Sequence, residues 1–116
     1  MKTAEVLHEE RHQAQHDDSI VLTLHIPATL CYFPDHFAHF PLLPGVVQID
    51  WAARYAQHYF ALTGAGQRLE QVKFQAVIKP DDTVQLSLKF EREKQRISFS
   101  YDSLRGRHAS GRIVFI

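Results

Sequence analysis

This sequence of 116 residues contains little cysteine, no surplus of charge of either sign and no long apolar run. The only cysteine, Cys31, excludes an internal disulfide, and a reducing cytoplasm is the simplest setting for such a chain. Thirteen basic residues balance thirteen acidic ones, which argues against a general nucleic-acid-binding protein. No apolar run is long enough for a membrane span or a signal peptide, so neither is expected.

What the sequence does contain is enough apolar material for one small domain. Hydrophobic residues make up 45% of the chain, and its length fits a single domain over residues 1–116. Domains of this size often bury further surface by pairing, so we expect a dimer.

Two periodicities divide the chain. Residues 19–26 alternate apolar and polar side chains, which predicts a half-buried strand that ends at Pro27. From Gly45 to about Thr63 the apolar spacing becomes three and four residues, which predicts a helix that Gly64 and Gly66 would end. The apolar positions of this helix cover most of its circumference, as in a buried helix: Val46, Val47, Ile49, Trp51, Ala53, Tyr55, Ala56 and Phe60.

After the helix, alternation with a period of two returns in four segments, at residues 72–78, 84–90, 97–101 and 111–115. Short turns separate them, which predicts an antiparallel meander. One apolar helix and one antiparallel sheet must bury their faces against each other, so the fold class is α+β.

A histidine and a carboxylate around the helix start form the candidate site. His36 lies in a proline-rich aromatic loop, and Asp50 follows 14 residues later (50 − 36) inside the helix. Pro44 and Gly45 lie between them and are typical of a helix start. Such a pair can serve as general base and acid, and the Gly45 N–H can stabilise an oxyanion.

The same stretch resembles a known family, the hot-dog-fold 3-hydroxyacyl-acyl-carrier-protein dehydratases, and is most similar to their aryl polyene biosynthesis subgroup. Segments 72–82 and 109–111 are similar to downstream segments of that family. The resemblance covers roughly the last hundred residues, a full domain. The residues in register with the family signature are Phe33, His36, Phe37, Pro41, Leu42, Leu43, Pro44, Gly45 and Asp50.

The resemblance implies a hot-dog fold and an enzyme that converts (3R)-3-hydroxyacyl thioesters on acyl carrier protein into trans-2-enoyl thioesters. His36 would remove the proton from C2, Asp50 would protonate the leaving hydroxyl, and the Gly45 N–H would bind the thioester carbonyl. No metal or redox cofactor is implied. In this family the histidine of one subunit faces the acid of the other, which implies a dimer, here expected to be a homodimer. Aromatic residues that would line the acyl tunnel, unless they are ordinary core, are Phe33, Phe37, Phe40 and Trp51.

Several positions depart from the family pattern. Asp35 replaces a glycine, Ala38 a proline, Arg54 a glutamine, and Asp81 the glycine of a Pro-Gly-Asp turn. Two alternatives therefore stay open: an acyl thioesterase on the same fold, and a non-catalytic carrier-binding subunit that pairs with an active relative.

Two further groups of residues are weaker candidates. His8, His12 and His16 would form a stripe on a helix, but short histidine motifs are mostly accidental and we expect no metal. Basic residues that would contact an acidic carrier protein are Arg54, Lys73, Arg105 and Arg107.

Overall fold

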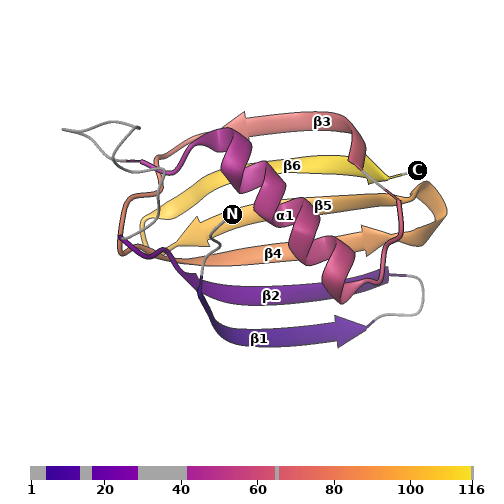
Figure 1. The fold of residues 1–116 in the computed structure, drawn as a ribbon, viewed down its shortest axis with the longest axis horizontal. Coiled ribbons are helices and arrows are strands. Elements are labelled where there is room, and N and C mark those ends of the chain that lie inside the picture. Colours follow the sequence, from indigo (N-terminus) through magenta and orange to yellow (C-terminus); the bar gives the residue numbers. More distant parts are fainter. Residues whose placement is uncertain (1–4, 14–16, 29–41, 65, 116) are drawn as a thin grey trace.

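One helix lies diagonally across one face of a six-stranded antiparallel sheet (Figure 1). The computed structural model describes residues 5–13, 17–28, 42–64 and 66–115. The helix is α1 (Gly45–Tyr59), and a short 3-10 helix, η1 (Arg92–Lys94), joins two strands. The strands are β1 (Glu5–Gln13), β2 (Asp17–His25), β3 (Gly66–Phe74), β4 (Thr83–Glu91), β5 (Arg96–Ser103) and β6 (Gly106–Phe115). This is the hot-dog arrangement that the family resemblance implied.

The sheet order is β1-β2-β4-β5-β6-β3, so only part of the predicted meander is present. Strands β4, β5 and β6 follow one another as expected, but β3 pairs with β6 at the far edge. The β3 strand also begins earlier than predicted, at Gly66, and ends at Phe74. A period of two reveals that a segment is extended but not which neighbour it joins, which explains the wrong pairing.

Strand β1 was not predicted at all, because its polar sequence has little apolar periodicity. It pairs with β2 from Glu5↔His25 to Gln13↔Asp18. His8 and His12 therefore belong to a strand, and the helical histidine stripe considered from their spacing is wrong. His16 lies outside the described residues.

Helix α1 ends at Tyr59, four residues before the predicted end (63 − 59). Ala61 adopts a left-handed conformation with φ of 53°, and the Leu62 N–H donates to the Gln57 carbonyl at 3.0 Å. This pattern is a Schellman motif, which usually has glycine at the position that Ala61 occupies. The glycines at 64 and 66 are therefore not what stops the helix.

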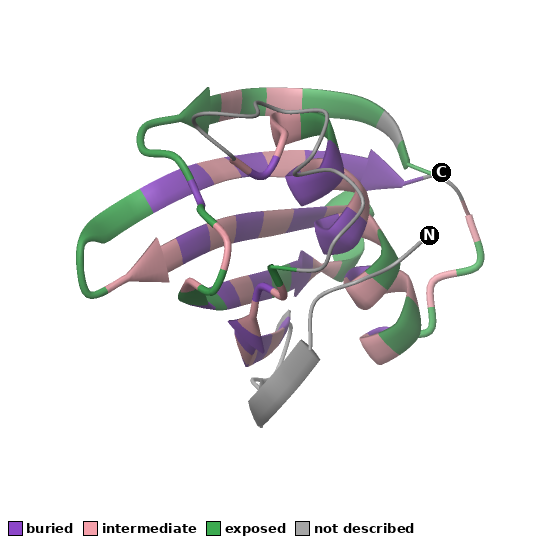
Figure 2. Ribbon diagram, turned by 60° about the vertical axis from the view of Figure 1, so that its left-hand side comes forward, coloured by how far each residue is buried: buried purple, intermediate pink, exposed green. Residues whose placement is uncertain are grey.

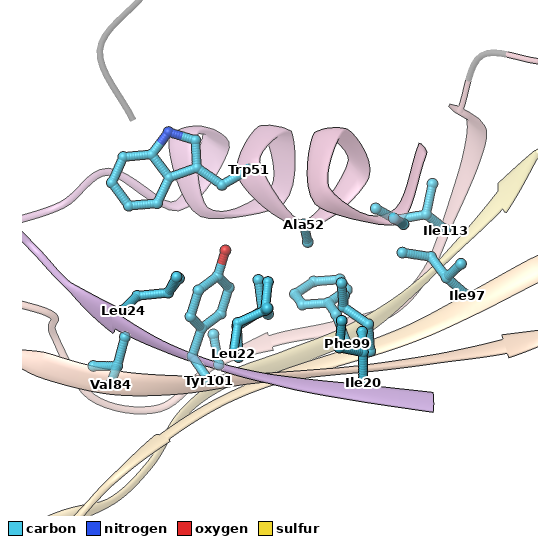
Figure 3. Packing of buried hydrophobic residues seen from close by; sticks show 14 of the residues in the cluster. Ile20, Leu22, Leu24, Trp51, Ala52, Val84, Ile97, Phe99, Tyr101 and Ile113 are labelled. Carbon is cyan, nitrogen blue, oxygen red and sulfur yellow. The ribbon is translucent and has the colours of Figure 1, made fainter. Parts of the chain in front are cut away.

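The core lies between the inner side of α1 and the sheet (Figures 2 and 3). Alternate residues of the central strands point toward the helix, as the buried-exposed alternation of β4 and β5 records. The helix contributes Val47, Trp51, Ala52 and Ala56 to this cluster. Figure 3 shows Trp51 and Ala52 of the helix together with core residues from β2, β4, β5 and β6: Ile20, Leu22, Leu24, Val84, Ile97, Phe99, Tyr101 and Ile113.

The predicted buried face of the helix is only partly correct. Val46 is 73% exposed, and Ile49 and Ala53 are only half-buried although they pack against the core, so the described chain covers this apolar stripe only in part. A helix that is apolar on nearly all sides is normally enclosed on all sides. The described chain covers one side of α1 and leaves an apolar stripe on the other.

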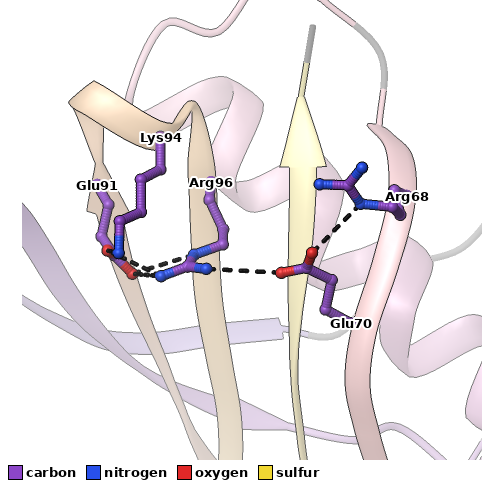
Figure 4. Close-up of polar contacts among 5 residues, drawn as sticks. All are labelled: Arg68, Glu70, Glu91, Lys94 and Arg96. Atoms are coloured by element: carbon purple, nitrogen blue, oxygen red, sulfur yellow. Dashed lines mark hydrogen bonds and ion pairs between the residues drawn. The ribbon is translucent and has the colours of Figure 1, made fainter.

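A charge ladder crosses the strands at one end of the sheet (Figure 4). Arg96 on β5 contacts Glu91 on β4 at 3.0 Å and reaches Glu70 on β3 at 3.5 Å. Lys94 and Arg68 extend the ladder at its two ends, at 3.7 Å from Glu91 and 3.2 Å from Glu70. The hydrogen bond from Arg96 lowers the pKa of Glu91.

Candidate active site

Asp50 lies in the second turn of α1, on the side away from the core, and its side chain is 35% exposed. The Arg54 Nε donates to the Asp50 Oδ2 at 2.8 Å, one turn further along the helix. Exposed pairs with this spacing are worth about 0.3–0.5 kcal/mol. The proposed proton donor therefore has a cation as its immediate neighbour.

A cleft of about 620 Å³ surrounds Asp50, between α1 and the edge strand β3. Apolar side chains from the helix and from β3 and β6 make up much of its lining, and four polar or charged residues share it. The lining residues are Val46, Ile49, Asp50, Ala53, Arg54, Gln57, Gly66, Arg68, Leu69 and Ile113.

Gly45 opens the helix and lies in a second cleft, of about 340 Å³. Pro44 is the N-cap and gives no side-chain cap, and the first turn holds no acidic residue. The Gly45 N–H has no acceptor among the described residues, as expected for the first turn of a helix. The ring of Phe74 lies so close that a Cβ on Gly45 would be 2.6 Å from it, so the position suits glycine.

Residues 74–77 form the other wall of the Gly45 cleft, and buried His108 holds residues 75–77 in place. The His108 carbonyl accepts from the Gln75 and Ala76 amides at 2.8 and 3.2 Å. Its ring contacts the Val77 carbonyl at 3.0 Å and the Ser103 hydroxyl at 2.7 Å. Nothing in the sequence distinguished this histidine from the others, because its partners come from two other segments, residues 75–77 and Ser103.

Gly45 and Asp50 belong to different clefts that share no lining residue. They are five residues apart, which separates them by about 140° around a helix. A small substrate in one cleft of the described chain therefore cannot contact both residues. Gly45 and Asp50, which the sequence placed in one site, therefore lie in different clefts on opposite sides of α1.

Four of the predicted site residues, His36, Phe33, Phe37 and Phe40, lie outside the described residues. The distance from His36 to Asp50 and the aromatic lining of the tunnel therefore stay predictions. The same holds for the family departures at Asp35 and Ala38.

Trp51 has a fully buried side chain in the core. Its Nε1 has no hydrogen-bond partner among the described residues, and in Figure 3 it points away from the sheet. Its role as a tunnel residue also stays a prediction.

Tyr101 fixes the helix to the sheet, a role that only its place in an alternating strand hinted at in the sequence. Its hydroxyl donates to the Gln48 carbonyl at 2.6 Å. Burial raises the pKa of Tyr101 well above its ordinary value of 10.0, and Tyr55 and Asp50 add to the effect. The phenol is thus a neutral donor that holds the first half of α1 over β5.

The basic residues proposed for carrier contact differ in their surroundings. Arg105 pairs with Asp82 at 2.7 Å and Arg107 with Asp102 at 2.9 Å, in addition to the Arg54–Asp50 pair. Burial opposes ionisation of Asp82, but hydrogen bonds from Arg105 and the Lys79 amide outweigh it, so the pKa is lowered. Lys73 is exposed and has no ion pair within the described part of the chain, so of the four basic residues it is the least engaged by its own chain.

Among residues 5–13, 17–28, 42–64 and 66–115, no cluster of histidine, cysteine and acidic side chains has the geometry of a metal site. Within the same ranges, no helix is long and apolar enough to cross a membrane.

Comparison with solved structures places the chain in the class that its fold and helix start define. It superposes on the dehydratase heterocomplex ApeI:P from Xenorhabdus doucetiae with a TM-score of 0.87, at 35% identity over 98% of both chains. An uncharacterised protein from Erwinia carotovora subsp. atroseptica matches at 32% identity and a TM-score of 0.91, over 99% of this chain and 97% of that one. These matches and the fold identify a hot-dog dehydratase.

The family can be stated more closely. The model of the ApeI-like family, described as ApeI dehydratase, matches residues 11–112, so the chain belongs to the ApeI-like dehydratase family. A variant of the GphF dehydratase has a TM-score of 0.52 at 20% identity, over 90% of this chain and 41% of that one, and supports the fold alone. No curated protein matches the chain.

Proposed function

We propose that the protein dehydrates (3R)-3-hydroxyacyl thioesters carried on acyl carrier protein, in fatty acid or aryl polyene biosynthesis. The C2–H bond breaks as His36 takes the proton, the C3–O bond breaks, and Asp50 gives the hydroxyl the proton that makes it water. The Gly45 N–H binds the thioester oxygen while negative charge develops there. The products are the trans-2-enoyl thioester and one water.

The observation that carries this proposal is the separation of Gly45 and Asp50 into two clefts on opposite sides of α1. A two-fold pair can bring the Gly45 cleft of one subunit to the Asp50 cleft of the other, which would complete two sites at once. The apolar stripe of Val46, Ile49 and Ala53 beside Asp50 supports a partner at that face. The partner is a second copy or a related subunit, and the similarity to the ApeI:P heterocomplex supports pairing of either kind.

The test is mass spectrometry of the carrier-bound acyl chain, in which dehydration appears as the loss of one water. His36→Ala should lower the rate about a hundred- to ten-thousandfold, as for loss of a general base. Asp50→Asn should be similarly impaired, because an amide cannot protonate the hydroxyl. His58→Ala and Glu93→Gln make the same chemical changes at exposed positions and should leave the rate unchanged. Full activity of His36→Ala would overturn the mechanism.

A second candidate function is that of a subunit that binds the carrier while its partner performs the chemistry. The Arg54–Asp50 ion pair favours it, because the Asp50 side chain already has a hydrogen-bond partner on its own helix. In that case Asp50→Asn would have no effect on dehydration by the assembled pair, and the corresponding change in the partner would abolish it. Free acid and thiol as products would instead indicate a thioesterase.

A further inference from the structure

Gln48 has one end of its carboxamide satisfied and the other end unpaired. The side chain is buried, with 4% exposure. Its Nε2 donates to the Leu43 carbonyl at 3.0 Å, so the amide orientation is fixed by a partner that only accepts. The Oε1 is buried and has no hydrogen-bond partner among the described residues. An unpaired buried acceptor is unfavourable and is uncommon without a functional reason.

Gln48 lines the Gly45 cleft, where the other side chains are mainly apolar: Leu42, Leu43, Phe74, Gln75, Ala76 and Val77. Most of the backbone donors in these walls are already used, since the Leu43 amide bonds to Ile78 and the Gln75 and Ala76 amides bond to His108. The polar groups that the described lining leaves for a ligand include the Gly45 N–H as a donor and the Gln48 Oε1 as a buried acceptor. They lie three residues apart, about 4.5 Å along a helix axis.

We propose that the Gln48 Oε1 accepts a hydrogen bond from the first amide N–H of the substrate's tethering arm. The inference rests on the proposed function, in which Gly45 binds the thioester carbonyl. In a pantetheine thioester, two methylene groups separate the sulfur from this N–H, a length comparable to the spacing of Gly45 and Gln48. Gln48 is thus a specificity residue that binds the tethering arm. This arm is the same in all carrier-bound substrates, whatever their acyl chain.

The 3-hydroxyl group is the other donor close to the thioester, and the geometry disfavours it. Gln48 shares a cleft with Gly45 and not with Asp50, the group proposed to protonate the hydroxyl. An N–H that enters an apolar cleft needs an acceptor there, and Gln48 supplies the one side-chain oxygen in the described lining that is buried and unpaired.

The experiment exchanges one atom of the substrate. The 3-hydroxyacyl thioester of N-acetylcysteamine carries the N–H, and the matching 2-acetoxyethyl thioester has oxygen in its place. For the wild-type protein in its active assembly, kcat/KM should favour the N–H compound by about ten- to a hundredfold. In the analogue, the ester oxygen would face the Gln48 Oε1, and both atoms are hydrogen-bond acceptors. Gln48→Met should bring the ratio close to one. Gln85→Met, the same change at an exposed position on β4, should leave the ratio at the wild-type value.

The ratio is insensitive to a general loss of stability, because both substrates are measured on the same variant. Gln48→Leu also removes the acceptor and should likewise bring the ratio close to one, which provides a second variant if Gln48→Met does not fold. A wild-type ratio near one, or a preference that survives Gln48→Met, would overturn the inference and would mean that a water alone satisfies Gln48.

A binding arm separates this inference from the proposed reaction. Calorimetry with unreactive S-alkyl thioethers of N-acetylcysteamine and of its oxygen analogue requires no turnover. One outcome is that the wild-type protein dehydrates neither thioester but binds the N–H thioether at least tenfold more tightly than the oxygen thioether, in a Gln48-dependent manner. That result would support the arm site and contradict the proposed reaction. If the protein dehydrates both thioesters equally well, the reaction stands and the arm site falls.

Discussion

Helix α1 has two apolar faces with different surroundings. The inner face, with Val47, Trp51 and Ala52, is fully enclosed by the sheet of the same chain. The outer face, with Val46, Ile49 and Ala53, is of similar apolar character but borders an open cleft. The inner face stabilises the fold, and the outer face is available for a partner. One helix can thus serve folding on one side and assembly on the other.

The largest expected effect is on the inner face. Trp51→Ala removes the largest fully buried side chain of the core and should lower the free energy of unfolding by about 3–5 kcal/mol. Urea unfolding followed by circular dichroism measures this loss. A loss below about 1 kcal/mol would mean that the inner face is not what holds the helix to the sheet.

A change on the outer face should separate assembly from folding. Val46→Asp places a carboxylate on the apolar stripe, and association with a second copy or a related subunit should weaken about ten- to a hundredfold. Because Val46 is 73% exposed, the unfolding free energy of the isolated chain should change little. Analytical ultracentrifugation measures the association.

Leu104→Asp is the matched control for this change, since Leu104 is fully exposed in the turn between β5 and β6. It should leave association unchanged. Equal effects of Val46→Asp and Leu104→Asp would contradict the assignment of the outer face to a partner.

The sequence anticipated the fold class, and it found the helix start at Gly45 because proline and glycine act locally there. It did not distinguish the two helix faces, since valine and isoleucine look alike whether their neighbours come from the same chain or from another. The β3–β6 pairing and the His108 contacts were also missed, because they depend on residues far apart in the sequence. The catalytic pairing of His36 with Asp50 stays a prediction because His36 lies outside the described residues.

A smaller effect, dependent on pH, is expected where the inner face meets β5. The pKa of Tyr101 is raised in the folded state, so its contribution to stability is complete below pH 10.0 and declines as the pH rises above that value. Tyr101→Phe should cost about 1 kcal/mol at neutral pH through loss of the bond to Gln48. It should also remove this part of the alkaline decline, which unfolding curves at pH 8 and pH 11 would measure.

The smallest effect concerns the end of the helix, beyond both faces. Ala61→Gly should raise the unfolding free energy by a few tenths to about 1 kcal/mol, because glycine adopts a φ of 53° without strain. Thermal unfolding would detect the gain as a small rise in Tm. Ala53→Gly, within the helix, is the control and should have the opposite sign.

The charge ladder of Figure 4 affects how the sheet edge opens. Arg96 holds Glu70 across the intervening strand β6, so edge strand β3 is connected to a strand that it does not touch through its backbone. Fraying of β3 therefore requires an ionic contact with β5 to break first, which makes local opening a cooperative event involving three strands. Since β3 also borders the Asp50 cleft, the Arg96–Glu70 ion pair connects that wall of the cleft to the interior of the sheet.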